Sequence, residues 1–184
     1  MAANGRRREQ QAAQNAGGAG GRRRTENADT NMGVTTYEDI LRDVSAAIER
    51  APSFDDALLQ TVTLLKEQAP DYTWVGIYLL VDDHLELGPF LGQPSPHTRI
   101  ALNAGICGAA ATSKETIIVD DVDADPRYLA CSLETRSEIV VPIMKGERVV
   151  GEIDIDSDKK AAFGSGDREL LEATAALLAG KFRG

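Results

Sequence analysis

The chain has 184 residues, of which 42% are hydrophobic and 27% are charged, values typical of one globular domain. No apolar run approaches the roughly 18–20 residues that cross a membrane, and residues 1–31 lack the apolar core of a secretory signal, so we expect a cytoplasmic protein without a membrane span. Two cysteines and two histidines exclude a disulfide-stapled scaffold and a four-cysteine zinc site, and we expect no bound metal.

The formal net charge of -9 is unevenly distributed along the chain. Residues 1–33 hold six arginines and three acidic residues, which leaves a charge of -12 on the remainder. A body this acidic repels phosphate backbones, so we expect no nucleic-acid binding by the folded part. The polar, arginine-rich composition predicts a disordered basic tail over residues 1–33 and a folded domain over residues 34–184.

Two amphipathic helices are predicted at the start of the folded domain. Thr36 and Ser53 are each followed three residues later by an acidic residue, which is the spacing of a helix N-terminal cap. Apolar residues then recur at helical spacing, and Pro52 and Pro70 end the two helices.

Strand signals follow the second helix. Residues 74–81 are β-branched and aromatic, and with residues 84–87 they flank Asp82 and Asp83, which predicts a hairpin. The glycines and prolines of residues 88–96 predict a strand that leaves the sheet through a loop.

The middle of the domain is predicted to be irregular. Residues 105–112 are small and alanine-rich, which favours a short helix packed closely on a sheet, and residues 116–119 favour a short strand. Residues 120–136 are mostly polar and predict a loop with one turn near residues 126–129.

A second hairpin and a last helix complete the domain. Residues 138–144 and 149–155 flank the turn at residues 145–147, and Ser165 is expected to cap the helix. The order of elements predicts an α+β fold in which helices cover an antiparallel sheet. The core face of the last helix is expected to hold Leu170, Leu171, Thr174, Leu177 and Leu178.

Two cysteines are candidates for chemistry. Cys107 stands between glycines at the start of the short helix, where the helix N-terminus and exposed amides would stabilise a thiolate. Cys131 lies in the longest polar loop, and loops commonly carry reactive groups. The alternative is that both are inert, small hydrophobic residues.

Three acidic residues belong to the second hairpin. Glu138 begins an otherwise apolar strand, and strand alternation puts Asp154 and Asp156 on one face of the partner strand. If the strands pair, repulsion among the gathered carboxyl groups raises at least one pKa, which would provide a proton donor near neutrality and a site for an ammonium group. The alternatives are a solvated outer face of the hairpin and a calcium site, although no EF-hand loop is present.

Two aromatic residues are candidates for a pocket wall. Trp74 and Tyr78 lie four residues apart in a predicted strand and therefore share a face. Such a pair could face a cation or a sulfur atom in a small pocket, or it could belong to the hydrophobic core.

Six motifs taken together resemble the GAF domain family and, within it, the free methionine-(R)-sulfoxide reductases. The resemblance covers roughly residues 37–178 and includes both cysteines and the three acids. The motifs are Trp74-Val-Gly-Ile-Tyr78, Leu87-Gly-Pro-Phe90, Gly105-Ile-Cys-Gly108, Tyr128-Leu-Ala-Cys131, Ser137-Glu-Ile-Val-Val-Pro142 and Asp154-Ile-Asp-Ser157.

The resemblance implies a fold and a reaction. The implied fold is a sheet of about six antiparallel strands with helices on its sides, often assembled as a homodimer. The implied reaction is the reduction of free L-methionine (R)-S-oxide to L-methionine without a bound cofactor, with thioredoxin as the external reductant.

The resemblance also implies roles for particular residues. Cys131 matches the catalytic cysteine, and Cys107 matches a resolving cysteine that would form a disulfide with it. One carboxylic acid would protonate the departing oxygen. The implied catalytic and substrate-binding acids are Glu138, Asp154 and Asp156, and the implied pocket aromatics are Trp74 and Tyr78.

One position departs from the family pattern. Members commonly carry a third cysteine in the loop before the Gly-x-Cys-Gly turn, where this chain has His97. Cys107 would then have to resolve alone, or small thiols would have to recycle the enzyme. The alternative function is a stand-alone GAF module that senses a small molecule or a redox state without turnover.

Overall fold

The computed structural model describes residues 35–130 and 132–183, and the expected tail over residues 1–33 lies outside them. The described residues form an α+β unit of four α-helices, one short 3₁₀ helix and six strands, as predicted for this fold class. No described helix is both long and apolar enough to cross a membrane. The elements are α1 (Tyr37–Arg50), α2 (Phe54–Gln68), β1 (Trp74–Val81), β2 (His84–Leu91), β3 (Arg99–Ala101), α3 (Gly105–Ser113), β4 (Ile117–Val119), η1 (Val122–Ala124), β5 (Ser137–Lys145), β6 (Arg148–Ser157) and α4 (Ser165–Lys181).

The six strands form one antiparallel sheet in the order β3-β2-β1-β6-β5-β4. Both predicted hairpins are present, as β1–β2 around Asp82 and Asp83 and as β5–β6 around Gly146 and Glu147. Strand β6 lies at the centre, hydrogen-bonded to β1 on one side and to β5 on the other. The longest pairing, β5–β6, therefore lies beside the β1–β6 pairing at the centre of the sheet.

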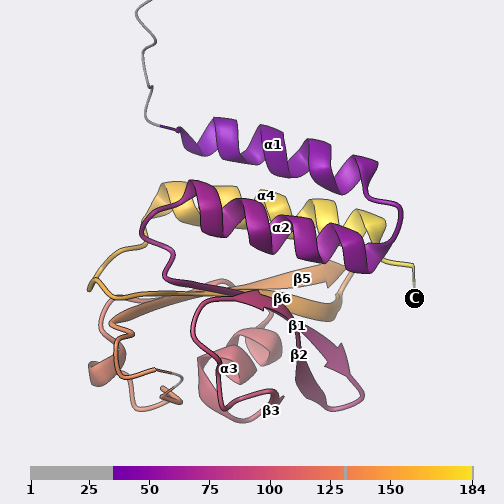
Figure 1. Ribbon diagram of the computed structural model, residues 1–184. Coiled ribbons are helices and arrows are strands. Elements are labelled where there is room, and N and C mark those ends of the chain that lie inside the picture. The colour runs from indigo at the N-terminus through magenta and orange to yellow at the C-terminus, as the bar shows by residue number, and fades with distance from the viewer. Residues whose placement is uncertain (1–34, 131, 184) are drawn as a thin grey trace, which may run out of the picture. The chain divides into compact units, whose positions relative to one another are not determined.

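Helices cover both faces of this sheet (Figure 1). Helices α2 and α4 pack on one face, with α1 lying over them, and α3 lies against the opposite face. Strand alternation divides β6 between the two layers. Ile153 and Ile155 join the core beneath α2 and α4, and the residues that alternate with them point to the opposite face, toward α3. The apolar half of β6 thus anchors the helical layer.

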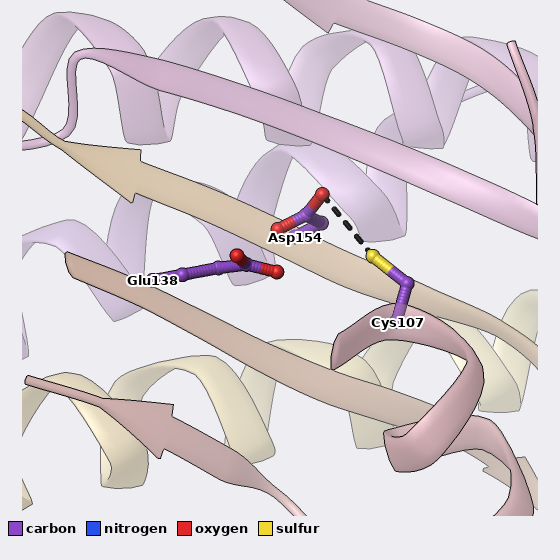
Figure 2. A group of neighbouring side chains, drawn as sticks. All are labelled: Cys107, Glu138 and Asp154. Atoms are coloured by element: carbon purple, nitrogen blue, oxygen red, sulfur yellow. Dashed lines mark hydrogen bonds between the residues drawn. The ribbon is translucent and has the colours of Figure 1, made fainter. Parts of the chain in front are cut away.

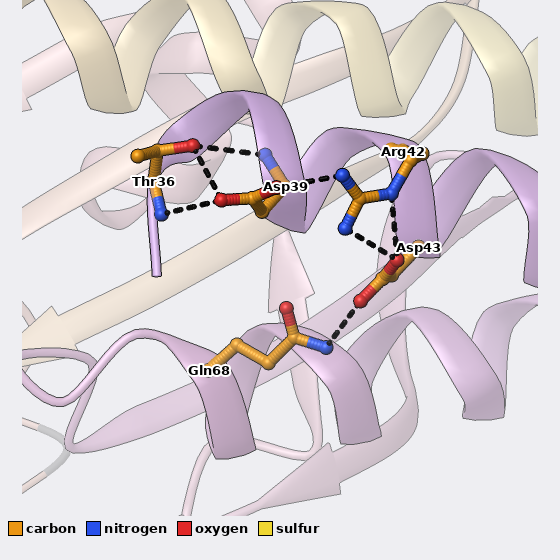
Figure 3. Close-up of polar contacts among 5 residues, drawn as sticks. All are labelled: Thr36, Asp39, Arg42, Asp43 and Gln68. Carbon is orange, nitrogen blue, oxygen red and sulfur yellow. Dashed lines mark hydrogen bonds and ion pairs between the residues drawn. The ribbon is translucent and has the colours of Figure 1, made fainter. Parts of the chain in front are cut away.

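The predicted caps of the first two helices are confirmed. Thr36 Oγ1 accepts a hydrogen bond from the backbone N–H of Asp39 at 3.2 Å, and the Asp39 carboxylate accepts from the Thr36 N–H, which is a capping box. Figure 3 shows that Arg42 extends this group by binding both Asp39 and Asp43, and that the Gln68 side-chain amide donates to Asp43 at 3.2 Å. This network links α1 to α2.

Two predicted boundaries are wrong. Ser165 is the first residue of α4 rather than its cap; the cap is Gly164, whose backbone N–H donates to the Asp167 carboxylate at 2.8 Å. Strand β2 continues to Leu91 instead of ending at Leu87, because an irregularity in its register with β1 accommodates the glycine and proline.

Two short elements are absent from the sequence prediction. Strand β3 has three residues, too few for an alternating pattern to be visible. The 3₁₀ helix η1 lies in the predicted polar loop just before the turn at residues 126–127. In α4, four of the five expected core residues are buried and Leu177 is only partly buried.

Two neighbouring leucines of α2 provide a matched test of the packing. Leu58 is 1% exposed and Leu59 is 53% exposed, so Leu58→Ala leaves a cavity between α2 and the sheet, whereas Leu59→Ala removes surface atoms. We expect the first variant to lose about 2–5 kcal/mol of unfolding free energy and the second to change by less than about 0.5 kcal/mol in urea denaturation. Equal losses would contradict this packing.

Candidate active site

The face of the sheet centre that points toward α3 combines acidic and aromatic side chains. Three rows run across β1, β6 and β5 at every second residue, and alternation therefore puts the residues of these rows on the same face. The rows are Trp74–Asp156–Glu138, Gly76–Asp154–Val140 and Tyr78–Glu152–Pro142. We call the four carboxylic residues of these rows, Glu138, Glu152, Asp154 and Asp156, the acid face.

All four carboxylic residues of the acid face are buried. Glu152 is 0% exposed, and the other three are 3–5% exposed. The alternative of a solvated outer face of the hairpin is therefore wrong, because α3 packs over this side of β5 and β6. Within the described residues, no basic side chain lies within ion-pair distance of these carboxyl groups.

Burial without a cationic partner raises the pKa of every carboxyl group of the acid face. Desolvation is the largest cause in each residue, and the charge of Asp154 adds to the pKa rise of Glu138, Glu152 and Asp156. The pKa of Asp154 itself rises to about 7. The pKa of Asp154 fits the expected proton donor near neutrality.

Cys107 joins the acid face from the first turn of α3 (Figure 2). Its thiol donates a hydrogen bond to Asp154 Oδ2 at 3.4 Å, and one oxygen each of Glu138 and Asp154 lies with the sulfur in a group whose members are all within 4.8 Å. The predicted thiolate at Cys107 is wrong. Burial first, and then the charges of Asp154, Glu152 and Glu138, raise the pKa of the Cys107 thiol, and these effects outweigh the helix N-terminus.

Glu152 is the residue of the acid face that the sequence interpretation missed. It lies two residues before Asp154 in β6, so the same alternation that grouped Asp154 with Asp156 would have found it. Neither of its carboxylate oxygens meets hydrogen-bond geometry with a partner among the described residues, although the nearby Cys107 thiol partly offsets the rise in the pKa of Glu152. Asp154 Oδ1 also has no hydrogen-bond partner among the described residues.

The two expected aromatic residues form a wall beside the acid face. The ring centroids of Trp74 and Tyr78 are 6.5 Å apart, and both rings are buried. The six-membered ring of the indole closely approaches Gly76, where an added Cβ would be 2.1 Å from the nearest ring atom, so the close approach favours glycine. Trp74 Nε1 donates to the Gln93 carbonyl at 3.0 Å, which fixes the ring in place.

A small cavity of about 50 Å³ lies at one end of this wall. Trp74 and Asp156 line it together with residues of two loops, including Gln93, Ser95 and Thr135. The cavity thus joins the aromatic wall to the acid face.

The expected nucleophile Cys131 lies outside the described residues, but the residues before it contact the site. Leu129 packs against Gly105 at the start of α3; Gly105 has a φ of +73°, and a Cβ there would lie 2.9 Å from Leu129. His97 Nε2 lies 3.2 Å from the Ala130 carbonyl oxygen, and the His97 carbonyl accepts from the Tyr78 hydroxyl at 2.8 Å. His97 therefore links the aromatic wall to the segment that leads into residue 131.

The chain is similar in sequence and fold to proteins of one family. The GAF domain family model matches residues 53–181. The free methionine-R-sulfoxide reductase of Escherichia coli K12 is 36% identical over 142 residues, which cover 77% of this chain and 86% of that protein.

Two solved structures with bound substrate are similar over most of the described chain. The free methionine-R-sulfoxide reductase of Neisseria meningitidis in complex with its substrate is 36% identical, with a TM-score of 0.76 over 79% of this chain and 87% of that chain. The fRMsr of Staphylococcus aureus in complex with substrate is 33% identical, with a TM-score of 0.75 over 83% and 99%. The chain therefore belongs to the GAF domain family, in the group that includes the free methionine-R-sulfoxide reductases.

Proposed function

We propose that this chain reduces free L-methionine (R)-S-oxide to L-methionine. The observation that carries the proposal is the acid face, which is buried, lacks a basic partner among the described residues, and lies between an aromatic wall and Cys107. Buried carboxyl groups of this kind favour a cationic group, and a free amino acid supplies an α-ammonium. The similarity to reductases that act on free methionine-R-sulfoxide supports the choice of substrate.

The proposed orientation of the substrate follows from the acid face and from the aromatic wall of Trp74 and Tyr78. The ammonium group would lie against the carboxylates of Glu138, Asp154 and Asp156, and the methyl sulfoxide would contact Trp74 and Tyr78. A methionine sulfoxide within a peptide chain has an amide in place of the ammonium. The site would therefore prefer the free amino acid.

The proposed first step is a two-electron transfer to the sulfoxide. The thiolate of Cys131 attacks the sulfoxide sulfur, and a protonated carboxyl group of the acid face gives its proton to the sulfoxide oxygen. The sulfur–oxygen bond of the substrate then breaks as the oxygen passes to the Cys131 sulfur, and the transient sulfur–sulfur bond breaks with it. The sulfoxide is reduced to the thioether, and Cys131 is oxidised to a sulfenic acid. The raised pKa values of these acids support a donor that still holds its proton near neutrality.

The proposed second step restores the enzyme through a disulfide. The Cys107 sulfur attacks the sulfenic acid of Cys131, a disulfide forms, and water leaves. Because the Cys107 thiol is protonated in the unliganded site, it must lose its proton, and Asp154 already accepts its hydrogen bond. The dithiol of thioredoxin would then reduce the disulfide. With His97 at the place of the family's third cysteine, Cys107 is the resolving residue of this proposal.

Turnover is tested by NADPH consumption in a coupled assay with thioredoxin and thioredoxin reductase. We expect consumption with the R epimer of free methionine sulfoxide and none with the S epimer. Cys131→Ser removes the nucleophile and abolishes turnover, whereas Cys107→Ser permits about one methionine per chain before the sulfenic acid accumulates.

The control substitution is Glu67→Gln. Glu67 is an exposed acid on α2, and we expect its substitution to leave the turnover rate unchanged. Absence of turnover with both thioredoxin and dithiothreitol would contradict the reductase proposal. Ligand binding or oxidation without turnover would instead support the stand-alone GAF sensing module.

The acid face also predicts a pH dependence of stability. The folded-state pKa of Asp154 is about 7, above the value of about 3.9 for an unfolded aspartate, so the folded state binds the extra proton. The contribution of Asp154 to stability is therefore full below about pH 4 and is lost as the pH rises through about 7.

Asp154→Asn removes this titration. Relative to the parent chain, we expect the variant to gain about 1–3 kcal/mol of unfolding free energy between pH 5 and pH 8 in urea denaturation. Parallel pH profiles for the two proteins would show that Asp154 does not carry this proton.

A further inference from the structure

Cys107, Glu138 and Asp154 come from three elements that are distant in sequence, namely α3, β5 and β6. Figure 2 shows their sulfur and oxygen atoms turned toward one another, and one donor atom from each lies within 4.8 Å of the other two. All three residues are 3–5% exposed. This set of one sulfur and two carboxylate donors requires only small side-chain shifts to surround one ion.

A second observation also points to a ligand. Asp154 Oδ1 and both oxygens of Glu152 are buried, and none of them meets hydrogen-bond geometry with a partner in the described part of the chain, although Glu152 lies close enough to the Cys107 thiol for each group to shift the pKa of the other. Glu152 leaves β6 on the same side as Asp154, and its charge contributes to the raised pKa of the Cys107 thiol. Buried polar atoms are normally paired, so these oxygens can accept a bond from a bound group.

Although the few cysteines and histidines led us to expect no bound metal, we propose that this cluster binds a borderline-soft divalent cation of the zinc class, with Cys107, Glu138 and Asp154 as ligands and Glu152 as the adjoining carboxylate. A sulfur donor at the centre distinguishes such an ion from calcium and magnesium, which take oxygen ligands. An ammonium group pairs with the carboxylates alone, whereas a zinc-class ion also binds the sulfur.

Binding of the cation exchanges protons for metal without any redox change. The thiol of Cys107 loses its proton when the metal–sulfur bond forms, and carboxyl groups that hold protons release them too. The metal would occupy Glu138 and Asp154, so it would exclude the substrate ammonium and prevent Cys107 from resolving a sulfenic acid. This competition rests on the proposed function, but the metal site itself does not.

The test is a titration of the reduced, metal-free chain with cadmium chloride. Cadmium stands in for zinc because its bond to a thiolate gives an ultraviolet charge-transfer band. Cys131→Ser is used as the parent so that Cys107 is the one thiol present. We expect a band that saturates at one cadmium per chain, proton release, and displacement by zinc but not by an excess of calcium.

Variants separate this site from unspecific binding. Cys107→Ser in the same parent should lose the band, and Glu138→Gln and Asp154→Asn should each weaken cadmium binding by at least about tenfold. Glu152→Gln removes the adjoining carboxylate and should weaken binding by about 10- to 100-fold. Glu67→Gln, an exposed acid on α2, should leave the affinity unchanged.

Three results would overturn the proposal: no band in the parent, a band that survives Cys107→Ser, or unchanged affinity in both Glu138→Gln and Asp154→Asn. Circular dichroism tests whether each variant is folded. If Cys107→Ser does not fold, the cadmium affinities of Glu138→Gln and Asp154→Asn decide whether the proposal holds. Cadmium binding in a chain without turnover would refute only the proposed function. Turnover in a chain that binds no cadmium would refute only the metal site.

Discussion

The alternation of β6 at the centre of the sheet is the constraint on which the fold and the candidate site both depend. Ile153 and Ile155 are fully buried against the helical layer, and the acidic residues between and beside them are buried on the opposite face. A register shift of one residue would exchange the two sets and place carboxyl groups in the apolar core. The same strand therefore anchors α2 and α4 and supplies the acid face.

Burying four carboxyl groups together destabilises the ionised protein unless a cation compensates them. Burial disfavours the charged forms, which raises the pKa of Asp154 to about 7, and burial together with the neighbouring acidic charges raises the pKa of the Cys107 thiol well above its usual value. An α-ammonium group and a zinc-class cation are two ways to supply the missing positive charge. The carboxyl groups of the acid face, which are proposed to bind the substrate, thus lower the unfolding free energy of the chain at neutral pH.

Much of the fold was predictable from local sequence signals, although the local signal at Ser165 misplaced the cap of α4 by one residue. The caps at Thr36 and Ser53 and the hairpin turn at Asp82 and Asp83 use only neighbouring residues, and the structure confirms them. Strand β3 was not predictable, because three residues carry no periodicity and its pairing with β2 is set by the sheet.

The candidate site was predictable only in part. Alternation places Asp154 and Asp156 on one face, and extending it by two residues finds Glu152. The burial of that face was not predictable, because it depends on α3 packing over β5 and β6. The same packing decides whether the Cys107 sulfur is protonated. Its position at the start of a helix favours a thiolate, whereas its buried surroundings favour a thiol.

The central claim is that the acid face recognises the α-ammonium group of free methionine (R)-sulfoxide. Isothermal titration calorimetry with the Cys131→Ser chain, in which no turnover occurs, tests it most directly by comparing this amino acid with its N-acetyl derivative. We predict that acetylation weakens binding by at least about 30-fold, the equivalent of about 2 kcal/mol, because the buried carboxylates lose their cationic partner. Equal affinity for the two compounds would contradict this claim.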